Sequence, residues 1–195
     1  HVYDGHLTTG IFGTRFLLDV LSRFGQENVA YEIVNQTTFP GWGYMLANGA
    51  TTLWEHWELS ENTYSHNHPM FGSVSEWFFK WLAGIQQAEG SVGFEQIIIH
   101  PVLPQGLTWV KASHRSVRGE IISEWYRQGN RFELDLYIPV NTSATVFLPA
   151  LEMESIREGG KNLSKVSEVD IVAVKSDHCV LRIGSGTYHF SSGIR

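Results

Sequence analysis

Hydrophobic residues in the first 90 positions recur at the spacing of α-helices. Thr8 or Thr9 can cap the start of the longest apolar stripe, and Gly25 stands where a helix-ending glycine belongs. That stripe consists of Phe12, Phe16, Leu17, Val20, Leu21 and Phe24. The same pattern predicts shorter helices over 29–34 and 42–46, and a longer one over 71–85.

Residues 91–195 instead show short apolar runs separated by turns. Within 131–138, apolar residues alternate with polar ones, which predicts a strand with one face in a core and one in water. The predicted strands are 94–100, 109–112, 119–126, 131–138, 144–148, 171–174, 179–183 and 187–190. Their number and spacing indicate an antiparallel β-sandwich. The predicted fold class is therefore α+β in two parts, with a helical domain over 1–90 and a sandwich domain over 91–195.

Composition excludes several classes of function. The 195 residues are 43% hydrophobic and 17% charged, so the chain can bury a core. The net charge of -6 arises entirely within residues 1–90, which argues against nucleic acid as a partner. No apolar run is long enough to cross a membrane, and no phosphate-binding or dinucleotide motif predicts a cofactor. Cys179 is the single cysteine, so an internal disulfide is impossible. The compartment cannot be inferred.

The candidate chemistry gathers in residues 41–68, which are rich in Trp, His and Glu. Glu55 follows Trp54 and lies two residues before Trp57. A carboxylate beside indole rings is partly desolvated, which makes it a better proton acceptor near neutral pH. On a strand, Glu55 and Trp57 would share one face and could line a pocket together. The alternative is a capping or ion-pairing Glu55 at the edge of a loop.

Two histidines follow in the same segment. His66 and His68 are two residues apart, so in an extended segment both side chains would point the same way, as metal ligands often do. A third ligand is missing from the pattern, and we therefore predict no metal. His68 could instead bind a sugar hydroxyl, or cap a helix that starts near Pro69.

Several strings of residues resemble bacterial α-L-rhamnosidases, glycoside hydrolase family seventy-eight. The most specific string is Gly-Ala-Thr-Thr-Leu-Trp-Glu-His-Trp at 49–57. The resemblance covers roughly residues 5–150 and also includes Leu7–Thr14, Trp42–Met45, Asn67–His68, Phe71–Val74, Ala83–Ile85, His100–Pro101, Gly106–Trp109 and Pro139–Thr142.

The resemblance implies the last helices of a catalytic (α/α)6 barrel followed by a C-terminal β-sandwich. It also implies hydrolysis of terminal α-L-rhamnose with inversion, on a rhamnose-containing glycoside or polysaccharide. By motif, Glu55 matches the general base and His68 a position in the sugar subsite. Trp42, Trp57 and His6 are plausible neighbours in the pocket. Inversion uses two carboxyl groups, and no motif here matches the family's general acid.

We therefore expect the chain to be part of a longer polypeptide that supplies the acid, and to be inactive alone. Its incomplete barrel should expose apolar faces that need the remainder of the parent polypeptide or promote self-association. His56 stands where relatives often carry Arg, and the segment from Glu55 to His68 is short for the family, so the rim of the pocket is expected to differ. Two alternatives stay open: a non-catalytic carbohydrate-binding or interaction module, and a related barrel glycosidase for another sugar.

Overall fold

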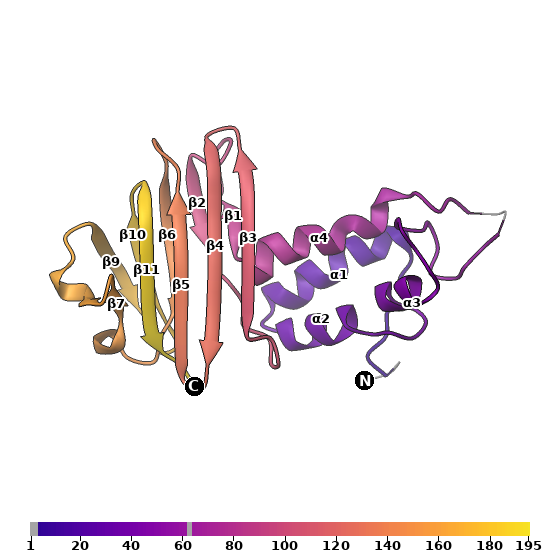
Figure 1. The fold of residues 1–195 in the computed structure, drawn as a ribbon, viewed down its shortest axis with the longest axis horizontal. Coiled ribbons are helices and arrows are strands. Elements are labelled where there is room, and N and C mark those ends of the chain that lie inside the picture. The colour runs from indigo at the N-terminus through magenta and orange to yellow at the C-terminus, as the bar shows by residue number, and fades with distance from the viewer. Residues whose placement is uncertain (1–3, 62–63) are drawn as a thin grey trace. The chain divides into compact units, whose positions relative to one another are not determined.

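The computed structural model describes residues 4–61 and 64–195 (Figure 1). The chain forms two compact units. One consists of His1–Phe78 with Leu103–Gln105, and the other of Phe79–Val102 with Gly106–Arg195. The first is helical and the second is made of strands, in the order that the hydrophobic pattern predicts. The domain boundary expected at residue 90 stays a prediction.

The helical unit contains the short helices that the apolar spacing indicates. They are α1 (Ile11–Arg23), α2 (Glu27–Val34), α3 (Trp42–Ala47), the 3-10 turn η1 (Pro69–Gly72) and α4 (Ser73–Trp77). Gly10, not a threonine, is the N-cap of α1, and no side chain caps it. Thr9 instead joins Thr14 through their hydroxyls at 2.8 Å. Gly25 has a φ of 68°, as expected of the residue just past a helix end.

Helix α1 buries two hydroxyl side chains beside one leucine and exposes apolar side chains on its other side. Its buried residues are Thr14, Leu18 and Ser22, and the Ser22 hydroxyl accepts a 2.8 Å hydrogen bond from Trp77 Nε1. Phe16 in the helix and Phe24 at its C-cap are 63% and 77% exposed. The expectation of exposed apolar faces in the helical part is therefore confirmed.

The long helix predicted over 71–85 is wrong at its C-terminal end. After α4 the chain makes one π-helical turn, η2 (Phe78–Leu82), and Ile85–Gln87 forms the short strand β1. Gly84 causes the change, because it has a φ of +76° and packs against the backbone of residues 100 and 101. Ile85 pairs with Ile99, and both side chains are buried.

The second unit contains two sheets, which Figure 1 shows as two layers. One has the order β1-β2-β6-β10-β9 and the other β3-β4-β5-β11-β7-β8. The remaining strands are β2 (Gln96–Ile99), β3 (Trp109–Ser116), β4 (Gly119–Gln128), β5 (Arg131–Ile138), β6 (Ser143–Pro149), β7 (Arg157–Glu158), β8 (Lys161–Asn162), β9 (Val169–Val174), β10 (His178–Ile183) and β11 (Gly186–Gly193). The 3-10 turns η3 (Met153–Ser155) and η4 (Leu163–Lys165) lie between β6 and β9.

The sandwich departs from a purely antiparallel pattern at one pair, because β2 runs parallel to β6. Strand β5 confirms the predicted alternation, with Phe132, Leu134, Leu136 and Ile138 all buried. Two buried side chains of β4 hold the segment before β1. Trp125 Nε1 donates to the Leu82 carbonyl, and the Ser123 hydroxyl donates to the Ala83 carbonyl, both at 2.7 Å. Cys179 is buried, and burial raises the pKa of its thiol, consistent with a packing role.

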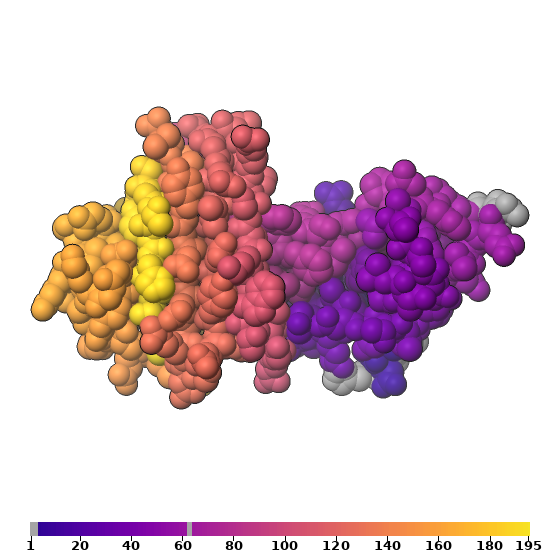
Figure 2. Space-filling view, in the orientation of Figure 1, coloured from indigo at the N-terminus to yellow at the C-terminus, as the bar shows by residue number. Residues whose placement is uncertain are grey.

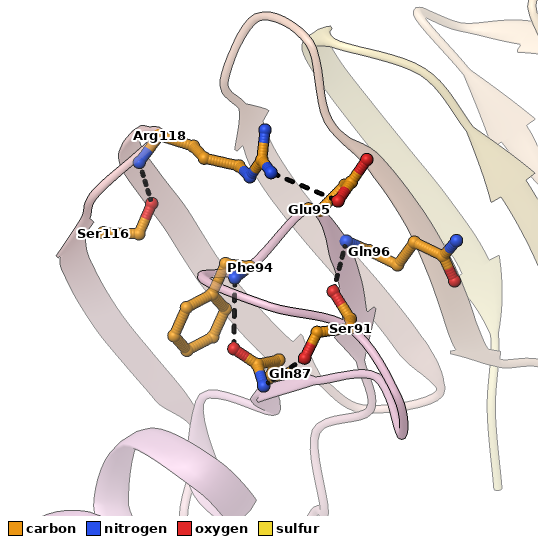
Figure 3. Close-up of polar contacts among 7 residues, drawn as sticks. All are labelled: Gln87, Ser91, Phe94, Glu95, Gln96, Ser116 and Arg118. Atoms are coloured by element: carbon orange, nitrogen blue, oxygen red, sulfur yellow. Dashed lines mark hydrogen bonds and ion pairs between the residues drawn. The ribbon is translucent and has the colours of Figure 1, made fainter.

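Polar side chains fix the connection between β1 and β2 (Figure 3). The Gln87 amide oxygen accepts from the Phe94 N–H at 3.1 Å, and its nitrogen donates to the Ser91 carbonyl at 2.8 Å. Arg118, in the turn between β3 and β4, pairs with Glu95 at 3.1 Å. This ion pair links the two sheets near one end. Among the described residues, no helix has the length and apolar character needed to span a bilayer.

Candidate active site

Glu55 lies in the loop between α3 and η1, and the loop holds it from both sides. The Glu55 N–H donates to the Ser65 carbonyl at 2.9 Å, and the Ser65 N–H donates to Glu55 Oε2 at 3.0 Å. The His68 N–H bonds the Leu53 carbonyl at 2.8 Å, so the two limbs of the loop are joined at a second point. These bonds fix the half-buried carboxylate, although residues 55–58 form bends rather than a strand.

The Glu55 pocket is a hollow of about 290 Å³ within the helical unit. Its lining is Gly10, Ile11, Phe12, Gly13, Glu55, His56, Trp57, Tyr64 and Phe71. Among the described residues of this lining, Glu55 is the single carboxylate, and most of the surface around it is apolar. Glu55 and Trp57 therefore face one pocket, as the sequence predicts. This combination of a concave apolar wall and few polar groups is typical of ligand sites.

Trp57 is rigidly held in the wall of this pocket. Its ring stacks on Phe71 with centroids 3.8 Å apart, and Nε1 donates to the Thr9 carbonyl at 2.8 Å. Trp42 packs edge-on against Trp57 at 5.1 Å, and its own Nε1 donates to the Phe71 carbonyl at 3.0 Å. Trp42 lies behind the pocket and lines a separate apolar pocket of about 540 Å³ instead. Sequence reasoning placed both indoles at the site, whereas the structure places only Trp57 in its lining.

The other predicted site residues lie outside the lining of the Glu55 pocket. His68 Nδ1 accepts a 3.4 Å hydrogen bond from the Met70 N–H, so it caps η1, which was one of the two alternatives for this residue. His6 Nε2 bonds the Thr38 hydroxyl at 2.7 Å. His66 Nε2 lies 2.5 Å from the Ser60 carbonyl. Across the described residues, no group of three or more His, Cys, Asp or Glu is arranged to hold a metal ion.

Sequence reasoning missed His56 and Tyr64 as a pocket wall. Their rings stack with centroids 4.9 Å apart and planes 12° from parallel. Both residues line the Glu55 pocket. Eight positions separate them along the chain, and only the return of the loop toward Ser65 brings them together. The contribution of residues 10–13 to the lining was also missed.

Comparison with known proteins identifies the family. Residues 1–82 match the bacterial alpha-L-rhamnosidase 6 hairpin glycosidase domain, and residues 84–162 match the bacterial alpha-L-rhamnosidase C-terminal domain. The chain belongs to the bacterial α-L-rhamnosidase family. The expected resemblance is thereby confirmed, and the family is one of glycosidases.

Curated relatives and solved structures agree with the two domain matches. An α-L-rhamnosidase of Streptomyces avermitilis is 33% identical over 96% of this chain and 18% of its own length. One from Formosa agariphila is 34% identical over 96% of this chain and 20% of its own. The α-L-rhamnosidase structure from Dictyoglumus thermophilum has a TM-score of 0.88 and 39% identity, covering 100% of this chain and 22% of that one. The Streptomyces avermitilis enzyme was solved with L-rhamnose, with a TM-score of 0.86, 32% identity and coverage of 97% and 18%. The chain thus spans about a fifth of these relatives.

Proposed function

We propose that the intact polypeptide removes terminal α-L-rhamnose with inversion, with Glu55 as the general base and the general acid outside residues 1–195. Family membership supports the reaction class. The observation that carries the assignment of Glu55 is its place as the single carboxylate in the lining of an otherwise largely apolar pocket. An inverting reaction needs one such carboxylate to take a proton from the attacking water and a second carboxyl, roughly 6.5–9.5 Å away, to protonate the leaving group.

The apolar wall of the Glu55 pocket suits a deoxy sugar. Rhamnose carries a methyl group in place of a hydroxymethyl group, so one edge of its ring is hydrophobic. Ile11 and Phe12, which is 75% exposed, can accommodate that edge, and Trp57 contributes the small part of its ring that is exposed while Phe71 supports it from the core. Ser65 orients Glu55 by donating its backbone N–H to one carboxylate oxygen and leaves the other oxygen to receive the proton.

Three further residues receive proposed roles in binding. His68 Nδ1 accepts a backbone hydrogen bond, so in the neutral ring Nε2 carries the proton and can donate to a sugar hydroxyl. Trp42 positions Trp57 by edge-on packing behind the pocket. His6 contributes by bonding the Thr38 hydroxyl, which lies in the loop before α3. No cofactor or metal is assigned to these steps.

We further propose that the helical part is the end of an (α/α)6 barrel, completed by the remainder of the parent polypeptide. The matched family model, a 6 hairpin glycosidase domain, supports this, as do the exposed phenylalanines of α1. The substrate would be a rhamnose-containing glycoside or polysaccharide. Residues 1–195 alone would lack the general acid and would therefore be inactive.

The test uses the intact parent protein with an aryl α-L-rhamnoside. Glu55→Gln should lower kcat by several orders of magnitude, because the amide cannot take a proton from water. The matched control is Glu58→Gln, which removes an exposed carboxylate three residues away and should leave kcat within a few-fold. Proton NMR of the first product should show β-L-rhamnose, the inverted anomer.

A small nucleophile separates a missing base from a damaged fold. In Glu55→Ala, added azide should restore turnover and give the β-configured rhamnosyl azide, because azide needs no base. Wild-type-like activity of Glu55→Gln would refute the role of Glu55. If the parent cleaves other aryl glycosides but not rhamnosides, rhamnose is refuted as the substrate. The role of Glu55 would then be tested with the same variants on the glycoside that is cleaved.

A further inference from the structure

One sheet of the sandwich presents aromatic and polar side chains on its outer side, a surface we call the Trp109 face. The register places Trp109 opposite Tyr126 and Tyr126 opposite Glu133 on three successive strands. The outward residues of β3, β4, β5 and β11 define it: Trp109, Lys111, Ser113, Arg115, Glu120, Ile122, Glu124, Tyr126, Gln128, Arg131, Glu133, Asp135, Tyr137, Thr187, His189 and Ser191. Figure 1 shows these four strands side by side, and Figure 2 shows that no other part of the sandwich covers them in this view.

Two aromatic rings dominate one end of the Trp109 face. Trp109 is 56% exposed, although tryptophan is normally well buried. Directly opposed residues on antiparallel strands have Cβ atoms about 4.5–5.5 Å apart, so the rings of Trp109 and Tyr126 form adjoining parts of one surface. Tyr137, 38% exposed, adds a third ring on β5. Exposed aromatic surface of this kind indicates a binding function.

Ion pairs and hydrogen bonds hold the polar side chains around the rings. Lys111 Nζ lies 3.2 Å from Glu124 Oε2 and 5.3 Å from the centre of the Tyr126 ring. Arg131 pairs with Glu133 at 2.7 Å, beside Tyr126 in the register. Hydrogen bonding to Tyr126 and then to Glu124 raises the pKa of Lys111, so the ammonium stays charged. The rings are thus bordered by ordered donors and acceptors.

We propose that the Trp109 face is a non-catalytic binding site for neutral oligosaccharide chains. A pyranose ring has an apolar side of C–H groups and a rim of hydroxyls, which match an aromatic pair bordered by paired carboxylates and cations. The charges on the outward residues nearly balance, because Lys111 pairs with Glu124, Arg131 pairs with Glu133 and Arg115 lies opposite Glu120. The face therefore offers no field of one sign to a polyanion or a polycation, which favours a neutral ligand. The interspersed charges also break up the continuous apolar area that a protein interface core needs.

This inference does not depend on the proposed hydrolysis. The Trp109 face lies on the strands of the second unit, whereas Glu55 and its pocket belong to the first. Polysaccharide binding can therefore be measured in a variant that does not hydrolyse rhamnosides, and hydrolysis can be measured in a variant that does not bind polysaccharide.

The experiment is affinity electrophoresis of the 195-residue chain in gels that contain a soluble polysaccharide. The neutral probes are xyloglucan, galactomannan and a rhamnan, and polygalacturonate is the polyanionic comparison. At least one neutral polymer should retard the chain. Trp109→Ala and Tyr126→Ala should each weaken that interaction by up to about tenfold, as expected for loss of one stacking ring.

Two matched controls and one rescue variant define the outcome. Val117→Ala removes a 90% exposed apolar side chain in the turn between β3 and β4 and should bind like the wild type, as should Glu55→Gln. Trp109→Phe should keep most of the binding, because it keeps an aromatic ring. Unchanged far-UV circular dichroism of each variant would show that weaker binding reflects loss of the ring and not misfolding. The proposal is overturned if no neutral polymer retards the chain, if Trp109→Ala binds normally, or if Glu55→Gln abolishes retardation.

Discussion

His100 shows how a single side chain links burial to pH at the residue scale. Its ring stacks on Phe147 with centroids 4.4 Å apart and lies 6.3 Å from the ring of His178. Burial, and then the nearby His178, lower the pKa of His100 from its ordinary 6.5, with Asp177 acting weakly in the other direction. The folded chain therefore favours the neutral imidazole.

The sign of the pH dependence follows from that lowered pKa. Well above pH 6.5 the ring is neutral in both folded and unfolded chains, so it adds no pH dependence there. As the pH falls below 6.5, the unfolded chain takes up a proton more readily and the free energy of unfolding decreases. Thermal denaturation between pH 7.5 and 5 should show a falling Tm, and His100→Gln should flatten part of this slope. Val117→Ala, which changes an exposed uncharged residue, is the control and should keep that part.

At the scale of elements, hydrophobic periodicity predicts some strands and helices, whereas contacts between distant residues determine others. The alternation in 131–138 predicts β5 because its period alone places Phe132 and Leu134 in the core. Helix-like spacing over 71–85 cannot reveal that the chain turns at Gly84, since the reason is contact with residues 100 and 101. Strands β7 and β8 have two residues each, too few for any periodicity, and they exist because partner strands bind them.

Gly84 gives an element-scale prediction with a matched control. A Cβ at this position would lie 2.3 Å from the Pro101 nitrogen, and the φ of +76° already disfavours a side chain. Gly90 has nearly the same φ, +75°, but open space around it. We expect Gly90→Ala to cost about 1 kcal/mol and Gly84→Ala at least about 2 kcal/mol more, because backbone must move. Urea denaturation measures both. Equal losses would show that backbone conformation alone, and not the close approach, requires glycine at 84.

At the scale of the molecule, the sequence predicts some residues of the candidate site, and the path of a loop determines the others. Residue types near Glu55 and the family motif predict Glu55 and Trp57, which do line one pocket. Tyr64 could not be predicted, because its contact with His56 depends on the path of a loop that Ser65 closes onto Glu55. His68 and Trp42 carry motif-based expectations, but in the structure His68 caps a helix and Trp42 packs edge-on against Trp57.

The apolar side of α1 leads to a prediction for the whole chain. Phe16 and Phe24 are 63% and 77% exposed, and surface of this kind favours association when nothing covers it. The 195-residue chain should therefore associate with itself as its concentration rises, which sedimentation velocity can measure. Replacing both phenylalanines with glutamate should shift the chain toward monomer, because desolvating the added carboxylates is costly. Val117→Glu, an equally drastic change at a 90% exposed position of the sandwich, should leave association intact. A wild-type chain that stays monomeric at high concentration would show that the exposed rings of Phe16 and Phe24 do not drive self-association.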